Sequence, residues 1–313
     1  TTNYSWGSLT SGVRIENTDY NSMGTVDGEA IEFSDSFTNV LPSVHGNIDI
    51  ANDQILRLSA SSGVNRPGYN EWRASASVDP TDRTVTGGNP TLEEEQAYGA
   101  DISYEWYFAP VSLFSAGAFY RTIDNVIFTD STTVDGGRYL DSAQGQQWDL
   151  NGPVNGDDGE FKGLELNLSV QDIADISTIP VRGFGFSANG TLVDSEFKAP
   201  DGRKFDLPGT SDLTWNASVF YENYGFSARV NYQFRDEWVS PVEDPEDKWG
   251  EQERVDANVS YQLPLDRSGI GVSLYVEANN LTDEVDTRFS GNGTINQAES
   301  YGRRYLAGIQ LDY

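Results

Sequence analysis

The stretch YGRRYLAGIQLDY, residues 301–313, decides the fold class because its side chains alternate in character. One set of positions is apolar or aromatic (Tyr305, Ala307, Ile309, Leu311 and Tyr313), and the other holds Arg304, Leu306, Gly308, Gln310 and Asp312. Successive side chains of a strand point to opposite faces, so the alternation predicts a strand with lipid on one face and water on the other. A soluble edge strand can share this pattern. The prediction therefore depends on whether the rest of the chain repeats it.

The same period of two recurs along most of the chain. Val255, Ala257 and Val259, for example, alternate with Asp256 and Asn258, and helical spacing fits none of these runs. We expect about twelve strands, each near the ~9–11 residues that a tilted membrane strand needs. They fall in or around 12–17, 44–50, 56–64, 98–108, 111–122, 164–170, 184–192, 213–221, 224–234, 255–263, 270–278 and 304–313. The predicted fold is all-β, a transmembrane antiparallel β-barrel.

The composition agrees with a barrel that has a wet interior and wet loops. Only 37% of the residues are hydrophobic and the mean hydropathy is -0.51. The sequence holds no run of eighteen apolar residues, so it offers no candidate membrane helix. It also lacks cysteine, which fits the periplasmic route without requiring it. The chain begins TTNYSWGSL without a basic and apolar leader, so we expect either a removed signal or a piece of something longer.

The formal charge of -29 argues against nucleic acid as a partner, because phosphate binding needs clustered Lys and Arg. Much of the acidity falls between predicted strands, as in NGDDGE at 155–160 and VEDPEDKWGEQE at 242–253. Charge in solvated connections costs little free energy. We interpret these runs as solvated loops rather than calcium sites, since their spacing does not match a calcium loop.

The lengths of the predicted connections indicate the orientation. The links near 51–54, 109–111, 172–182, 222–224 and 264–268 are mostly short. The alternate links are mostly long, at about 21–35, 66–95, 124–160, 194–211, 236–251 and 282–300. Outer-membrane barrels place short turns in the periplasm and long loops outside. We therefore expect the first strand to rise from the periplasm and the last to return there.

Several short motifs then carry a family resemblance. They are Asn65-Arg66-Pro67, Val78-Asp79-Pro80, Gly87-Gly88-Asn89-Pro90-Thr91-Leu92 with Glu95, Tyr104-Glu105-Trp106-Tyr107-Phe108, Asn279-Asn280-Leu281-Thr282-Asp283 and Tyr301-Gly302-Arg303. In this order they resemble the barrel of TonB-dependent outer-membrane receptors, and cover nearly the whole chain. Many relatives have proline before the final glutamate of the third motif, where this chain has Glu94.

The resemblance implies a specific architecture and location. Family members have a 22-stranded barrel in the bacterial outer membrane, filled by an N-terminal plug, and this chain resembles only the later barrel strands. Residues 1–313 are therefore expected to form one domain, the C-terminal portion of such a barrel, with the plug and early strands absent. The alternative is a self-contained small barrel, either a passive porin or an adhesin.

The resemblance also implies a function and partners. The expected function is active import of a nutrient, driven by the TonB-ExbB-ExbD complex through the missing plug. Outer-membrane lipid and the barrel assembly machinery, acting through the C-terminal strand, are the other expected partners. The motif arrangement looks like the proteobacterial branch associated with oligosaccharides, so an oligosaccharide is the expected ligand. A siderophore or metal-complex receptor of the same family is the alternative.

Aromatic residues in the predicted outer loops are the candidate ligand contacts. Flat rings with nearby carboxylates and amides suit the apolar faces and hydroxyls of sugars. The candidates are Tyr69, Trp72, Tyr139, Trp148, Trp238 and Trp249, with Phe289 nearby, and Trp72 and Trp148 stand farthest from strand ends. Packing or an interfacial girdle is the competing interpretation. The acidic mouth disfavours an anionic ligand, leaves a neutral sugar unaffected and favours a cationic or metal-bound ligand.

Catalysis and resident cofactors have little support in the sequence. It contains no cysteine, one histidine, no Gly-x-Ser-x-Gly elbow and no phosphate loop. A serine hydrolase would have to use His45 as its base. His45 alternates onto the polar face with Ser43 and Asn47, where a hydrogen-bonding wall residue is expected rather than a metal ligand. We therefore expect no enzyme activity, no cofactor and no metal.

Overall fold

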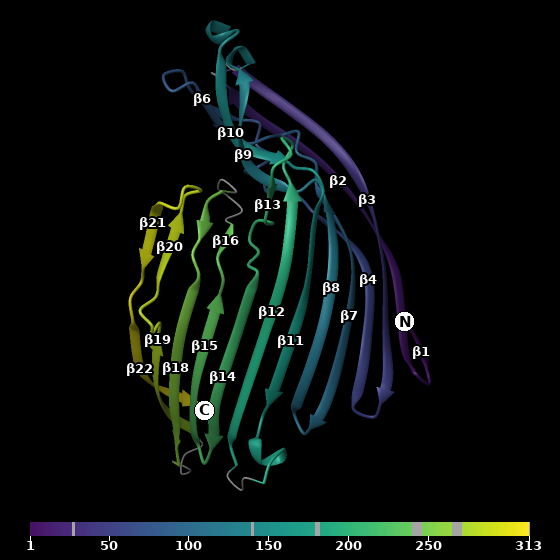
Figure 1. Ribbon diagram of the computed structural model, residues 1–313, viewed down its shortest axis with the longest axis vertical. Coiled ribbons are helices and arrows are strands. Elements are labelled where there is room, and N and C mark those ends of the chain that lie inside the picture. Colours follow the sequence, from purple (N-terminus) through teal and green to yellow (C-terminus); the bar gives the residue numbers. More distant parts are fainter. Residues whose placement is uncertain (27–28, 139–140, 179–181, 240–245, 265–270, 313) are drawn as a thin grey trace.

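The chain folds around one large antiparallel sheet, shown in a computed structural model that describes residues 1–26, 29–138, 141–178, 182–239, 246–264 and 271–312 (Figure 1). The sheet has fourteen strands, and without the short β1 (Thr2–Tyr4) and β13 (Lys204–Phe205) twelve long strands remain. These twelve are β2 (Gly7–Val26), β3 (Glu29–Ala51), β4 (Gln54–Asn65), β7 (Glu95–Ala109), β8 (Ser112–Asp124), β11 (Gly159–Val170), β12 (Phe184–Lys198), β14 (Leu213–Asn223), β15 (Phe226–Arg235), β18 (Gln252–Leu263), β19 (Gly271–Asn279) and β22 (Arg304–Asp312). All twelve predicted strands are confirmed, and residues 270 and 313 of the predicted ranges lie outside the described residues.

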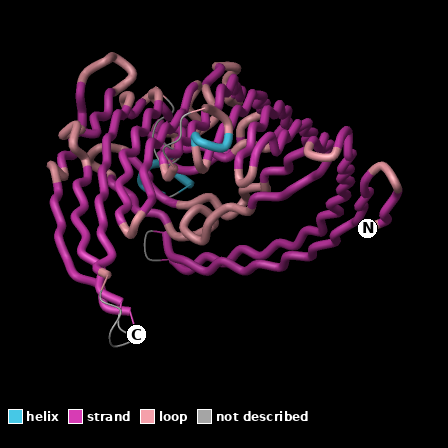
Figure 2. The backbone as a smooth tube through the Cα atoms, turned by 90° about the horizontal axis from the view of Figure 1, so that it is seen from below, coloured by secondary structure: helices cyan, strands magenta, loops and turns pink. Residues whose placement is uncertain are grey.

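Each long strand pairs with its neighbours in chain order, and the sheet is not closed. The order runs from β1 and β2 to β19 and β22, and every pair in this sheet is antiparallel. Among the described residues, β22 pairs with β19 alone. The two chain ends lie at opposite ends of the curved sheet (Figure 2). The sheet is therefore an arc of a barrel with two open edges.

Short connections gather at one end of the strands and long ones at the other (Figure 1). Two of the short turns use a non-glycine residue with a left-handed backbone, Val111 at φ 54° and Tyr224 at φ 54°. Both were predicted as the first residues of strands. Each instead lies in the tight turn, because reversal within so few residues needs a positive φ, and β8 and β15 begin just after them.

The segment 21–35, predicted as a loop, is mostly strand. β2 and β3 continue their pairing from Gly7↔Ile48 to Val26↔Glu29, far past the apolar part of the hairpin. Here the alternation is interrupted, because Phe33 and Phe37 share their face with Asp35 and with polar residues of β2 such as Ser22. Backbone hydrogen bonds and contacts at Tyr20, Phe33 and Phe37 stabilise this extension instead.

The long connections fold into two further four-stranded sheets. One consists of β5 (Ala76–Asp79), β6 (Thr84–Gly87), β10 (Gln147–Asn155) and β9 (Ile127–Asp135). The other consists of β16 (Trp238–Val239), β17 (Lys248–Trp249), β20 (Val285–Phe289) and β21 (Ile295–Ser300). Three 3₁₀ turns complete the described elements: η1 (Gly136–Arg138), η2 (Asp141–Ala143) and η3 (Ile173–Asp175).

The buried apolar side chains lie mostly in these connections rather than within the large sheet. One cluster comprises Val126, Phe128, Phe197, Ala199 and Leu207, and a second comprises Val85, Ala143 and Trp148. In contrast, long apolar side chains on the large sheet stay exposed, including Val259, Ile309 and Leu311. A sheet with one apolar exposed face is the arrangement expected where lipid replaces a protein core.

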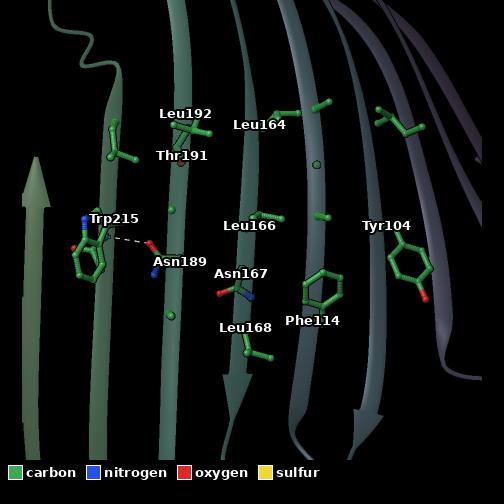
Figure 3. Close-up of a pocket in the computed structure, with 18 of the residues that line it drawn as sticks. Tyr104, Phe114, Leu164, Leu166, Asn167, Leu168, Asn189, Thr191, Leu192 and Trp215 are labelled. Atoms are coloured by element: carbon green, nitrogen blue, oxygen red, sulfur yellow. Dashed lines mark hydrogen bonds between the residues drawn. The ribbon is translucent and has the colours of Figure 1, made fainter. Parts of the chain in front are cut away.

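The apolar face carries a shallow groove of about 730 Å³ that runs from β4 across β7, β8, β11 and β12 to β14 (Figure 3). Leu164, Leu166 and Leu168 of β11 form its central ridge. Small residues on the neighbouring strands, Ala116 and Gly190, are the register partners of Leu166 and leave space on either side of it. No helix in the described ranges is long and apolar enough to cross a membrane.

Candidate functional site

The polar face of the N-terminal strands is held by ion pairs between neighbouring strands. Arg57 on β4 forms a bidentate pair with Glu105 on β7, at 2.7 and 3.0 Å, and donates to the Asn47 side-chain oxygen at 2.9 Å. Arg121 on β8 contacts Asp101 on β7 at 2.5 Å. Bidentate arginine pairs fix geometry as well as charge. This half of the polar face is therefore a cross-linked wall.

The Gly87 to Glu94 segment forms a hub at the end of the sheet where the long connections lie. The Asn89 side chain donates to the Pro153 carbonyl at 3.2 Å, and Asn155 donates to the Glu93 carbonyl at 2.9 Å. The Glu94 side chain is only 5% exposed. Burial raises the pKa of Glu94 above its ordinary value, because the charged carboxylate loses hydration there.

Trp72 packs into this hub. Its ring stacks on Tyr20 with centroids 4.4 Å apart and planes 5° apart, and its Nε1 donates to the Leu92 carbonyl at 3.0 Å. Tyr20 in turn donates to the Pro90 carbonyl at 2.5 Å. Only 7% of Trp72 remains exposed. In this conformation the indole joins a loop to the β2 and β3 hairpin and has little surface left for a ligand.

Trp148 is also buried, in the sheet of β5, β6, β9 and β10. It is 2% exposed and belongs to the cluster with Val85 and Ala143. A Cβ added at Gly136 would lie 2.6 Å from its Nε1, so this close approach requires glycine. Within the described residues its Nε1 has no hydrogen-bond partner. Trp148 was a candidate because it stands far from the predicted strand ends, but in the structure it forms part of a hydrophobic core within the long connections.

Trp238 and Trp249 form a stacked pair between two arginines. Their ring centroids are 6.1 Å apart with planes 13° apart. The Arg235 guanidinium lies 4.1 Å from the Trp238 centroid, and that of Arg288 lies 6.0 Å from the Trp249 centroid. Cations at such distances are attracted to the ring faces. Both tryptophans are half-buried.

Tyr69 is the most accessible of the candidates, with 95% of its surface exposed. Tyr139 lies outside the described residues. Phe289 ends β20 and is half-buried. The five described contacts are therefore not brought together into one pocket, and ligand binding by the six predicted residues stays a prediction.

Two basic residues join the long connections. Lys248 on β17 donates to Asp206 at 3.1 Å and to Glu237 at 2.9 Å. Arg203 pairs with Glu246 at 2.9 Å and lies 3.6 Å from Asp130. These contacts connect segments from four different places in the sequence. Because acidic residues outnumber basic ones 49 to 20 in the chain, each cation here balances several carboxylates.

A second part of the polar face, on β18, β19 and β22, was not singled out from the sequence. It is a recess of about 640 Å³, lined on this face by Asn258, Ser260, Ser273, Tyr275, Glu277 and Gln310. These polar residues alternate with Val259, Leu274, Val276 and Ile309, which is visible in the sequence. Which polar residues of the three strands lie side by side depends on the strand register, which the sequence does not give. His45, on β3, lies elsewhere on the polar face. The described residues contain no group of three or more His, Cys, Asp or Glu side chains that could hold a metal ion.

At the end of the large sheet where the short connections gather, Asp172 caps η3. The Ala174 backbone N–H donates to its carboxylate at 3.0 Å, and Arg182 lies 3.3 Å away. The Ala174 hydrogen bond, with help from Arg182, holds the pKa of Asp172 below its ordinary value. This turn is the longest connection at that end and is tied down locally by its own side chains.

Comparisons with known proteins identify the family. The model of the TonB dependent receptor-like β-barrel matches residues 1–281. No curated protein sequence matches the chain. Among solved structures, the copper transporter OprC is similar with a TM-score of 0.65 and 17% identity, over 97% of this chain and 45% of that protein.

Two further solved structures share the fold. The ferric yersiniabactin uptake receptor FyuA from Yersinia pestis matches with a TM-score of 0.62 and 15% identity, over 98% of this chain and 43% of its own. The ferric-catecholate import receptor Fiu from K12 E. coli matches with a TM-score of 0.64 and 13% identity, over 99% of this chain and 43% of its own. The chain therefore spans less than half the length of each of these proteins.

Proposed function

Because the chain belongs to the TonB-dependent receptor β-barrel family, whose barrels lie in the bacterial outer membrane, we propose that it forms part of an active transporter that imports a nutrient. The observation that carries this proposal is the match over residues 1–281 together with the open arc of twelve long strands. The remaining strands of a 22-stranded barrel, and a plug, would come from outside residues 1–313. This portion would be one barrel domain.

In this proposal the TonB-ExbB-ExbD complex supplies the energy, acting on the plug rather than on this chain. The barrel assembly machinery would engage β22, whose apolar face carries Tyr305, Ile309 and Leu311, all more than 60% exposed. Outer-membrane lipid would cover the same face around the arc. The cross-linked wall of Arg57, Glu105, Arg121 and Asp101 would keep the lumen rigid while the plug moves.

An oligosaccharide is the ligand class that we propose first. The net charge of -29 gives the chain a field that repels anions and leaves neutral solutes unaffected. Tyr69 offers an accessible ring at the outer end for the apolar face of a sugar. Carboxylates and amides around it can accept and donate hydrogen bonds to hydroxyls.

A ferric-siderophore or other metal complex is the second candidate. One observation favours it: Arg235 and Arg288 flank the Trp238 and Trp249 stack and could attract an anionic complex in spite of the overall charge. The names of FyuA, Fiu and OprC refer to ferric or copper transport. At 13 to 17% identity these proteins share the fold, and their ligands do not transfer.

Whole-cell binding with the full-length receptor distinguishes the two ligand classes. Cells are incubated with a labelled mixture of malto-, xylo- and chito-oligosaccharides or with labelled ferric catecholate complexes. Tyr69→Ala should weaken sugar binding severalfold, whereas Tyr224→Ala, an equal change at an 88% exposed residue of a periplasmic turn, should not. Saturable binding of the ferric complex alone, lost in Arg235→Gln, would favour the second candidate instead.

A further inference from the structure

The polar face of the barrel arc differs between its two ends. On β4, β7 and β8 the polar side chains are paired with one another, through Arg57 with Glu105 and Arg121 with Asp101. On β18, β19 and β22 they are mostly uncharged and open. Asn258, Ser260, Ser273, Tyr275 and Glu277 form no side-chain hydrogen bond or ion pair with any described residue.

Strand register places both groups on the same face. Paired residues of an antiparallel ladder point to the same side, so the face can be followed from strand to strand. From Arg57 it passes through Ser103, Gly117, Glu165, Thr191 and Thr214 to Arg235. Two-residue steps along β15 lead from Arg235 to Arg229, which pairs with Asn258, and Asn258 pairs with Glu277. The recess therefore opens into the lumen.

Tyr275 gives this recess a flat aromatic wall. Its register partner is Gly308, and a Cβ added at Gly308 would overlap the end of the Tyr275 ring. The ring thus lies across the glycine on the neighbouring strand. Because Gly308 supports one face of the ring, the opposite face is directed toward the lumen.

The charges around the recess balance one another. Glu277 is the one carboxylate among the described lining residues, and Arg304 on β22 is its diagonal neighbour, because Glu277 pairs with Leu306 and Asn279 pairs with Arg304. Arg229 on β15 lies farther away, since it pairs with Asn258, and it is engaged with the Phe220 ring at 4.3 Å and with Glu222 at 3.3 Å. A recess with mostly uncharged groups and no net charge favours a neutral solute over an ion.

We propose that this recess binds a neutral, polyhydroxylated solute inside the lumen. It would be a second binding site, which the solute reaches after the outer loops on its way through the receptor. A sugar ring would stack its apolar face on Tyr275, while its hydroxyls bond to Asn258, Ser260, Ser273 and the Glu277 carboxylate. The recess volume of about 640 Å³ is within the range of small-molecule sites. This inference rests on the proposed import function and deepens it.

Cysteine labelling tests the recess without requiring transport. The chain has no cysteine, so Ser273→Cys introduces a single thiol into it; any cysteine elsewhere in the full-length receptor is first replaced. A water-soluble methanethiosulfonate reagent is applied to outer membranes with and without the mixture of malto-, xylo- and chito-oligosaccharides. We expect the thiol to react, and the sugars to slow its reaction at least threefold.

The matched control is Ser43→Cys, on the same lumen face of β3 and far around the arc. Its labelling rate should not change with sugar. Protection at position 273 should be lost when Tyr275→Ala is added and retained with Tyr275→Phe, because stacking needs the ring and not its hydroxyl. This contrast separates binding on the ring from a general change in the barrel.

Two results would overturn the inference. If the thiol at 273 does not react although the receptor is folded, another part of the receptor covers the recess and no solute can reach it. If it reacts but the sugar mixture gives no protection, the recess does not hold a sugar. Energy-dependent uptake that persists in either case would leave the transporter proposal intact, so the two failures are distinguishable.

Discussion

An arginine placed on each face of β18 in turn tests which side of the sheet meets lipid. Val259 is the middle of five residues on the apolar face of β18, from Val255 to Leu263. At ~3.4 Å per residue and a ~40° tilt, either end of that run is roughly 10 Å away along the membrane normal. An arginine side chain is too short to place its whole guanidinium in water from there. Val259→Arg should therefore cost about 2–4 kcal/mol of folding free energy.

Asn258→Arg is the matched change one residue away, on the lumen face. Its register partners are Arg229 and Glu277, so the new charge meets one like and one opposite charge. The two effects largely offset each other, and the expected cost is below about 1 kcal/mol. Equilibrium unfolding of the full-length receptor from lipid vesicles, followed by tryptophan fluorescence, measures both variants. An equal or greater loss for Asn258→Arg would refute the assignment of the two faces.

Three further predictions concern other parts of the chain. Gly163→Ala should destabilise the barrel by about 1–3 kcal/mol in the same unfolding assay, because its Cβ would overlap the Leu192 backbone oxygen, whereas Gly12→Ala has open space and should change little. Glu94→Gln should stabilise the fold at neutral pH, because burial raises the pKa of Glu94 in the folded state above its pKa in the unfolded state. The carboxylate therefore destabilises the fold increasingly as the pH rises from the unfolded-state pKa through the folded-state pKa. Unfolding measured over a series of pH values should show that the stability gain of Glu94→Gln vanishes below both pKa values. Lys248→Gln should speed limited proteolysis of the outer loops, because Asp206 and Glu237 lose their shared cation, and unchanged cleavage rates would contradict that role.

The barrel strands could be predicted from the sequence because lipid imposes a local rule. Every second residue of a membrane strand must be apolar, so runs such as Val255 to Leu263 reveal the strand without knowledge of its partners. Strand residues outside the membrane do not have to follow this alternation. In the part of the β2 and β3 hairpin far from the short turns, Asp35 interrupts the apolar run of Phe33 and Phe37, and the segment 21–35 was therefore mistaken for a loop.

The loop tryptophans could not be interpreted in the same way. Trp72 and Trp148 stand far from strand ends in the sequence, which suggested accessible positions. In the structure Trp72 stacks on Tyr20, fifty-two residues away, and Trp148 is enclosed by residues from β6 and η2. Burial in loops depends on such long-range contacts, and sequence distance does not report them.

The polar recess shows the same limit in strand register. Alternation predicts that Ser273, Tyr275 and Glu277 share a face, but not that Tyr275 lies across Gly308. A register shift of one residue would turn each of these side chains to the other side of the sheet. Sequence alone could therefore indicate a polar lumen but could not locate a recess within it.

Energy-dependent uptake tests the central claim most directly. Cells carrying the full-length receptor are given the labelled oligosaccharide mixture and, separately, labelled ferric catecholate complexes, with and without a protonophore and with and without TonB. The account predicts that one of these ligands accumulates, that accumulation requires both TonB and the proton gradient, and that surface binding survives when either is removed. Uptake that continues without TonB and without the gradient would contradict active transport and would indicate a passive channel.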